Sequence, residues 1–159
     1  MEPWPEPVER VAAVLRRRAV DARLEEFIEG TTTAEDAARA VGCGKSQIVK
    51  TLVFVVDGRT VLALLPGDRR ADASKLATAV GGTHARVAGR DEVLAATGFE
   101  PGGVAPFPAP HVSAVVLDRE LLRHDTVWIG AGTPRHVAGL SPVDLTRVAG
   151  AEIADLSEG

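Results

Sequence analysis

A lysine interrupts one of the apolar stretches of the chain. Lys50 lies within Ile48-Val49-Lys50-Thr51-Leu52-Val53-Phe54, a run whose β-branched residues predict a buried strand. A charged lysine is almost never fully buried unless it is paired. Lys50 therefore either extends from the start of the strand to water or holds a partly desolvated ammonium at the mouth of a pocket. In the second case the ammonium could bind a phosphate or a carbonyl oxygen.

Two segments rich in glycine and proline interrupt the pattern of regular elements. The first runs from Gly98 to Pro110 around Gly102-Gly103-Val104-Ala105-Pro106, and the second is Gly130-Ala131-Gly132-Thr133-Pro134. The simpler interpretation is a surface turn whose geometry is set by proline. The alternative is a functional loop, because glycines let a ligand approach the backbone and leave N–H groups free to stabilise an oxyanion.

Other familiar kinds of site are not supported by the residue spacing. Gly44-Lys45-Ser46 resembles part of a phosphate-binding loop, but Arg39 stands where that loop needs a glycine. The four histidines are scattered without a companion cysteine for zinc, and no serine lies in a Gly-x-Ser-x-Gly turn. Cys43 follows a predicted helix end, where a thiol is not activated. We expect an unreactive Cys43, no metal ion and no cofactor.

Composition and charge limit the class of protein. The chain has 159 residues, 45% hydrophobic and 25% charged, which fits one globular domain. Its net charge of −4 argues against a protein that coats nucleic acid along its length, and against a DNA-binding protein. Only three of the eighteen basic residues are lysines, namely Lys45, Lys50 and Lys75, so the position of each is informative.

The sequence also predicts where the protein resides. A single cysteine excludes an internal disulfide and favours a reducing compartment. The acidic, proline-rich start lacks the features of a signal peptide, and runs such as Leu52–Val56 are far shorter than the ~20 residues of a membrane span. We expect a cytoplasmic protein with no membrane partner and with residues 1–7 as a flexible start.

Hydrophobic spacing and capping signals predict the elements that carry these residues. Thr33 and Ser141 are predicted helix N-caps, and Asp57-Gly58 is a predicted hairpin turn between two central strands. The result is an α/β (α+β) fold, one domain over residues 1–159, with a mixed, mostly antiparallel sheet packed by helices. The helices are expected at 6–20, 33–41, 72–80, 91–97, 119–123 and 141–149, and the strands at 24–28, 48–56, 60–65, 83–87, 112–117, 126–129, 135–137 and 152–154.

Four segments, in their order and spacing, carry a family resemblance. They are Thr31–Ala38, Ile48–Phe54, Ala96–Pro106 and Gly130–Pro134. Together they resemble the YbaK/ProX family of aminoacyl-tRNA deacylases, which is related to the editing domain of bacterial prolyl-tRNA synthetases. The resemblance covers about residues 8–156, and it is the ordered set of motifs, not any one of them, that is specific.

The resemblance implies a free-standing, metal-independent hydrolase that cleaves the ester of a mischarged aminoacyl-tRNA. Lys50 matches the family's strand lysine, which lies near the terminal nucleotide and the ester. Gly102 and Pro106 match the ends of its Gly-x-x-x-Pro loop, which includes Gly103 and orients the substrate carbonyl and water. The nucleophile would be a ribose hydroxyl of the tRNA or a bound water. Such a site needs no triad, since an aminoacyl ester is already activated.

Substrate binding is expected on both sides of this loop. Candidates before it are Phe27, Thr31 and Thr33, and candidates in the second glycine segment are Gly130, Gly132 and Thr133. That second segment departs from the Gly-Gly-Lys-Arg type of sequence in cysteinyl- and alanyl-specific members, so the edited amino acid stays open. The expected partners are the 3′ end of a mischarged tRNA and an aminoacyl-tRNA synthetase that delivers it.

Two other functions remain as alternatives. The first is a non-catalytic module that uses the pocket to bind a small metabolite or a synthetase, which the negative net charge favours. The second is a hydrolase for another activated ester or amide.

Overall fold

The turn at Asp57-Gly58 organises the larger of two β-sheets. In the computed structural model, which describes residues 4–27 and 33–159, β2 (Val49–Val56) and β3 (Arg59–Pro66) pair in antiparallel register with Val56 opposite Arg59. Asp57 has φ 49° and Gly58 φ 82°, as a two-residue turn of the hairpin type requires. The predicted hairpin and its central position in the sheet are both confirmed.

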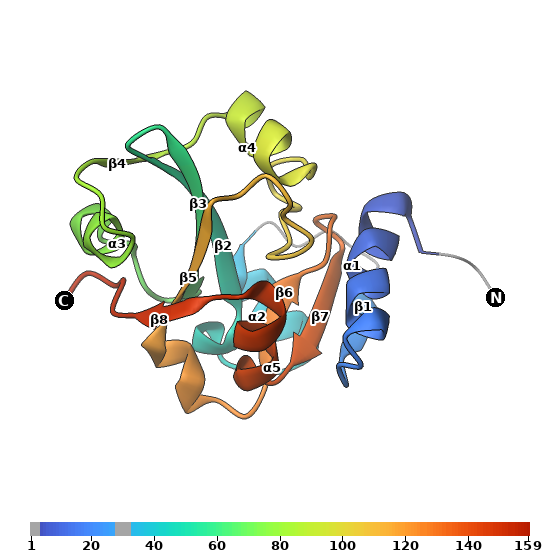
Figure 1. Cartoon of the computed structure of the whole chain (residues 1–159). Coiled ribbons are helices and arrows are strands. Elements are labelled where there is room, and N and C mark those ends of the chain that lie inside the picture. The colour runs from blue at the N-terminus through green and yellow to red at the C-terminus, as the bar shows by residue number, and fades with distance from the viewer. Residues whose placement is uncertain (1–3, 28–32) are drawn as a thin grey trace.

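The remaining strands are divided between two sheets (Figure 1). In the five-stranded sheet, β4 (Ala85–Val87) pairs antiparallel with β2, while β5 (Ala114–Asp118) is parallel to β3 and to β8 (Glu152–Ala154). The three-stranded sheet has the order β1-β7-β6 and is antiparallel throughout. The mixed, mostly antiparallel α/β prediction is confirmed, with the pairs distributed over two sheets. The strands of the smaller sheet are β1 (Arg23–Glu26), β6 (Val127–Gly130) and β7 (His136–Leu140).

The two sheets meet where β2 begins. Ile48, just before β2, forms an isolated parallel bridge with Trp128 of β6. Both side chains are buried in one cluster with Ala37 and Ala38 of α2 (Ala34–Val41). This junction joins the start of β2, which carries Lys50, to β6, which ends at Gly130.

Two helices begin at the side chains that the sequence predicts. The Thr33 hydroxyl accepts a hydrogen bond from the Asp36 N–H at 3.0 Å, and Ser141 does the same for the Asp144 N–H at 3.0 Å. Such N-caps satisfy amides that have no partner within a helix. Thr33 caps α2 and Ser141 caps α5 (Pro142–Ala149). The other helices are α1 (Glu6–Arg17), α3 (Ala73–Ala79) and α4 (Arg90–Thr97), with short 3₁₀ turns η1 (Lys45–Gln47) and η2 (Arg119–Arg123).

The first helix differs from its prediction at both ends. It stops at Arg17 instead of residue 20, and Ala19 has φ 53°, which is incompatible with a continuing helix. It starts at Glu6, and the carbonyl carbon of Pro7 lies 2.7 Å from where a Cβ on Gly132 would stand. The flexible start expected for residues 1–7 is therefore wrong for Glu6 and Pro7, which are helical and packed.

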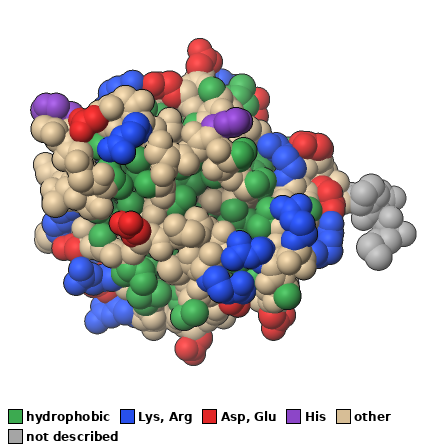
Figure 2. Space-filling view, in the orientation of Figure 1, with side chains coloured by type: hydrophobic (Ala, Val, Ile, Leu, Met, Phe, Trp, Pro, Cys, Tyr) green, Lys and Arg blue, Asp and Glu red, His purple; other side chains and the backbone are tan. Residues whose placement is uncertain are grey.

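The main core lies between the two sheets and anchors the first glycine–proline segment. It joins α1 and the three-stranded sheet to one face of β2 and β3, and it includes Phe99, Ala105 and Phe107. Burial of a side chain as large as Phe contributes about 1.5–3 kcal/mol to stability. On the face shown in Figure 2, basic and acidic side chains are interspersed. Within residues 4–27 and 33–159, none of the helices has the length and apolar character needed to cross a bilayer.

Candidate active site

The two glycine-containing segments lie against each other with their backbones in contact. A Cβ added to Gly103 would stand 2.9 Å from the carbonyl oxygen of Gly132 and 2.9 Å from the Cα of Thr133. A Cβ added to Gly130 would stand 2.8 Å from the carbonyl oxygen of Val104. Any side chain at either position would force the segments apart. The glycines predicted as separate site elements are therefore brought together.

Residues 102–106 form a loop that is exposed at its start and buried at its end. Gly102 is exposed with φ 92°, a conformation that favours glycine, whereas Pro106 is buried. Ala105 and Phe107, on either side of Pro106, are in the core between the sheets. The loop is therefore held firmly at its C-terminal end and exposes Gly102 at the surface.

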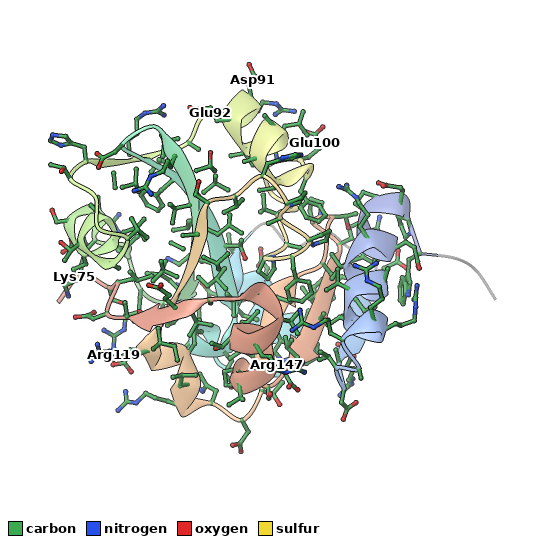
Figure 3. All side chains as sticks on the ribbon, in the orientation of Figure 1. Lys75, Asp91, Glu92, Glu100, Arg119 and Arg147 are labelled. Carbon is green, nitrogen blue, oxygen red and sulfur yellow. The ribbon has the colours of Figure 1, made fainter. Side chains whose placement is uncertain are left out.

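The amides of this loop are not equivalent. The Gly103 N–H donates to the carbonyl oxygen of Glu100 at 3.0 Å, so the expectation that both glycine amides are free is wrong for Gly103. Figure 3 shows Glu100 next to the end of α4, where the loop begins. Among the described residues, the amides of Gly102 and Val104 find no acceptor. These two N–H groups are the candidate donors to an oxyanion.

Lys50 is on the face of β2 opposite to the residues that pack with the 102–106 loop. Side chains alternate along a strand, and Val49 and Val53 of β2 are in the core that contains Ala105. Lys50 points to the other side, as does Phe54, which is in the second core cluster. Among the described residues the Lys50 ammonium bonds to the Arg69 carbonyl, so the structure does not bring it into contact with this loop.

The Lys50 ammonium is held by the protein and is not neutralised by it. Its Nζ donates to the backbone carbonyl of Arg69, and within the described parts of the chain it has neither an ion pair nor a hydrogen bond to residues 102–106. Burial lowers the pKa of Lys50, the nearby charges of Lys45 and Arg70 lower it further, and the Asp68 carboxylate opposes them. Of the two alternatives for Lys50, the partly desolvated ammonium describes its surroundings better.

The predicted substrate-binding residues have different surroundings. The Phe27 backbone lies beside the second glycine segment, since its N–H donates to the Arg135 carbonyl at 2.8 Å and its carbonyl accepts from the Arg135 guanidinium at 3.1 Å. Thr33 is exposed and acts as the N-cap of α2. Thr133 is half-buried, and its hydroxyl accepts from the Arg135 N–H at 3.1 Å. Thr31 lies outside the described residues.

His136 lies against the second glycine segment and was not singled out from the sequence. It is 4% exposed, and its Nδ1 lies 2.5 Å from the Thr133 hydroxyl. Its Nε2 has no hydrogen-bond partner among the described residues and lies 3.8 Å from a Glu26 carboxylate oxygen. Burial lowers the pKa of His136. The one signal in the sequence was that His136 follows Thr133 by three residues, a spacing at which the two side chains can meet within one turn.

Neither a metal cluster nor a reactive thiol is found in the described parts of the chain. No three His, Cys, Asp or Glu side chains there come together as metal ligands. Cys43 is half-buried, and burial raises the pKa of its thiol, as expected for an unreactive cysteine. A groove of about 400 Å³ beside Pro106–Pro110 is lined by apolar residues and Ser113, so it offers no titratable group for catalysis.

Comparisons with known proteins agree with the expected family. The family model described as "Aminoacyl-tRNA editing domain" matches residues 28–148. The Bacillus subtilis (strain 168) protein YwhH is 36% identical over 124 residues, covering 77% of this chain and 78% of YwhH. Proline–tRNA ligase of Nitratidesulfovibrio vulgaris (strain DP4) is 36% identical over 141 residues, which are 88% of this chain. The chain spans only 24% of the length of that ligase.

A solved structure has the same fold over the whole chain. It is described as a candidate trans-editing enzyme for prolyl-tRNA synthetase, with a TM-score of 0.91, 38% identity, and coverage of 99% of this chain and 100% of that one. Sequence family, relatives and structure thus agree. The chain belongs to the aminoacyl-tRNA editing domain family, as a YbaK-like protein related to the editing domain of prolyl-tRNA synthetases.

Proposed function

We propose that this protein is a deacylase that acts in trans on mischarged aminoacyl-tRNA, releasing the amino acid and the tRNA. The observation that carries the proposal is the close contact of the 102–106 loop with the second glycine segment, which leaves the Gly102 and Val104 amides without acceptors among the described residues. Such amides are suited to stabilise negative charge on an ester oxygen. The role of Lys50 rests on its match to the strand lysine of the family. The similarity to a candidate trans-editing enzyme supports action in trans.

The reaction requires a positioned water and an electrostatic pocket. The water oxygen adds to the ester carbonyl carbon and the carbonyl oxygen becomes negative. The carbonyl then re-forms, the bond to the ribose oxygen breaks, and that oxygen takes up the proton that the water gives up. The amides of Gly102 and Val104 donate to the developing oxyanion, since neither has an acceptor among the described residues. Pro106, fixed between buried neighbours, keeps these amides in place.

The remaining site residues position the substrate. Lys50 binds the terminal nucleotide next to the ester, where its charge also favours the oxyanion. Phe27, Thr31, Thr33, Gly130, Gly132 and Thr133 surround the aminoacyl group or its ribose. The protein works in the cytoplasm on the 3′ end of the tRNA, with a synthetase as a delivery partner and without a metal ion. Relatives that are proline–tRNA ligases make tRNA for proline the first substrate to test.

The test is deacylation of a panel of tRNAs for proline that carry Ala, Cys, Ser or Thr, with correctly charged prolyl-tRNA as the cognate control. We expect hydrolysis of at least one mischarged species above the buffer blank, prolyl-tRNA spared, and no loss of rate with EDTA. Hydrolysis of none of them, or loss with EDTA, would overturn the proposal as stated. Tight binding of a mischarged tRNA without hydrolysis would instead favour the non-catalytic module.

A further inference from the structure

Cations gather around Lys50 from two separate segments of the chain. Lys45 opens η1, just before β2, and Arg69 and Arg70 follow the end of β3. The segments are in contact, because a Cβ added to Gly67 would stand 2.6 Å from the Lys45 carbonyl oxygen. Lys50 joins them through its hydrogen bond to the Arg69 carbonyl. We call Lys45, Lys50, Arg69 and Arg70 the cationic cluster.

The positive charge of this cluster is not balanced by the protein. Lys45 and Arg70 are exposed, and within residues 4–27 and 33–159 their side chains make no ion pair or hydrogen bond. Asp68 is the carboxylate within the same segment, and Glu120, which borders the neighbouring cavity with Arg69, is already paired with Arg123 at 2.9 Å. Residues 45–50 and 67–70 thus hold four cations and one carboxylate, in a chain whose net charge is −4.

The excess of positive charge in the cationic cluster is unfavourable for stability, so folding alone does not explain why it is there. Like charges placed close together repel, and the repulsion is visible at Lys50, whose pKa Lys45 and Arg70 lower. Some exposed arginines of this chain pair with acids three or four residues away, such as Arg39 with Asp36 and Arg147 with Asp144. The cationic cluster differs because several basic side chains without an ion pair among the described residues gather in one place, which is the pattern of a surface that receives an anion.

We infer that Lys45 and Arg70, flanking Lys50, bind a backbone phosphodiester of an RNA 3′ end as that end enters the site. The inference rests on the proposed function, because it takes the terminal nucleotides of a tRNA as the occupant. It explains how a chain of net charge −4 can hold a polyanion, since the required positive charge is concentrated beside the site. Arg69 supports the cluster by holding the Lys50 ammonium through its carbonyl.

The test measures binding without chemistry. A fluorescent single-stranded RNA ending in CCA, and carrying no amino acid, is titrated into wild type and into Lys45→Ala/Arg70→Ala at several salt concentrations. The matched control is Arg18→Ala/Arg59→Ala, which removes the same charge from two exposed arginines without ion pairs in the described parts of the chain. Arg59 lies at the opposite end of the β2–β3 hairpin.

We expect the cluster variant to bind about tenfold more weakly at low salt. The slope of log affinity against log salt should fall by about 0.7–0.9 for each phosphate that the variant no longer neutralises. The control should bind like wild type, and equal binding by the two variants would overturn the inference. Inorganic phosphate is also tested as a competitor of the labelled RNA. Competition by millimolar phosphate as effective as that by unlabelled RNA would show a free-phosphate site and would also overturn it.

This outcome is separable from that of the proposed function. If weakened binding and a reduced salt slope are found but no aminoacyl-tRNA is hydrolysed, the phosphodiester site stands and the deacylase proposal fails. If hydrolysis is found and the cluster variant keeps wild-type kcat/KM and RNA affinity, the deacylase stands and the phosphodiester site fails.

Discussion

The carbonyl oxygen of Val104 lies 2.8 Å from the position that a Cβ on Gly130 would occupy. This contact joins the loop that presents the candidate oxyanion donors to the end of β6. It also makes the second glycine segment part of the candidate site through its lack of a side chain. The geometry of the whole site therefore depends on how closely these two backbones approach.

Gly130→Ala should displace the 102–106 loop and lower deacylation. The methyl group would meet the Val104 carbonyl oxygen, which must move by several tenths of an ångström or more. Misplacement on the scale of 1 Å can cost about 100-fold in rate, so we expect kcat/KM to fall by about 10–100-fold. The matched control is Gly89→Ala, where the nearest atom to an added Cβ is 3.6 Å away. Equal activity of the two variants would show that the contact does not shape the site.

The activity should fall at high pH earlier than an ordinary lysine would require. Burial and the charges of Lys45 and Arg70 lower the pKa of Lys50 below 10.5. If the ammonium form acts, the enzymatic rate, corrected for hydrolysis in buffer, decreases as the pH rises through that lowered value. Lys50→Arg should keep its charge and lack this decrease. Lys45→Ala should move the decrease to higher pH, and an unchanged profile in Lys45→Ala would contradict this electrostatic coupling.

Thr33→Ala should destabilise the protein, because Thr33 caps α2 through the Asp36 N–H. Loss of such a cap costs about 1 kcal/mol, measurable by denaturant unfolding, and Thr33→Ser should restore it. Ser141→Ala, which removes the corresponding cap of α5, is the control. If Thr33 also contacts substrate, Thr33→Ala lowers kcat/KM while Ser141→Ala does not. Equal kcat/KM in both would leave Thr33 as a cap alone.

Acid should destabilise the protein partly through His136. Burial lowers the pKa of His136 below 6.5, so near and below that pH the unfolded chain binds more protons than the folded one. Stability then falls as the pH falls. Between about pH 7.5 and 5, we expect His136→Asn to lose less stability than wild type. His84→Asn, at an exposed histidine, serves as control. A loss in His136→Asn as large as in wild type would rule out this contribution.

Most of the fold could be predicted from local signals in the sequence. Asp57-Gly58, Thr33 and Ser141 each determine a turn or a helix start through their own backbone or nearest neighbours, so they could be recognised from the sequence. The division into two sheets could not, because it depends on pairings such as Ile48 with Trp128, which are far apart in the chain. The early end of α1 at Arg17 reflects the backbone of Ala19, which no residue type announces.

The site was predicted in part for the same reason. Lys50 and the glycine segments stand out by residue type, but the contact between the two glycine segments depends on residues far apart in the chain, such as Gly130 and Val104. That the Gly103 amide is already used by Glu100 follows from a turn that glycine and proline content does not specify. The cationic cluster joins Lys45 to Arg69 and Arg70 across the β2–β3 hairpin. The net charge of the chain, which is negative, gives no sign of it.

The most direct measurement of the central claim is the single-turnover deacylation rate of one mischarged tRNA by wild type, Lys50→Ala and Arg59→Ala. We expect Lys50→Ala to be slower by about 100-fold or more, the scale seen when an electrostatic contact to an oxyanion is removed. Arg59→Ala should match wild type, and all three should unfold at similar temperatures. A Lys50→Ala protein that deacylates as fast as wild type would contradict the account.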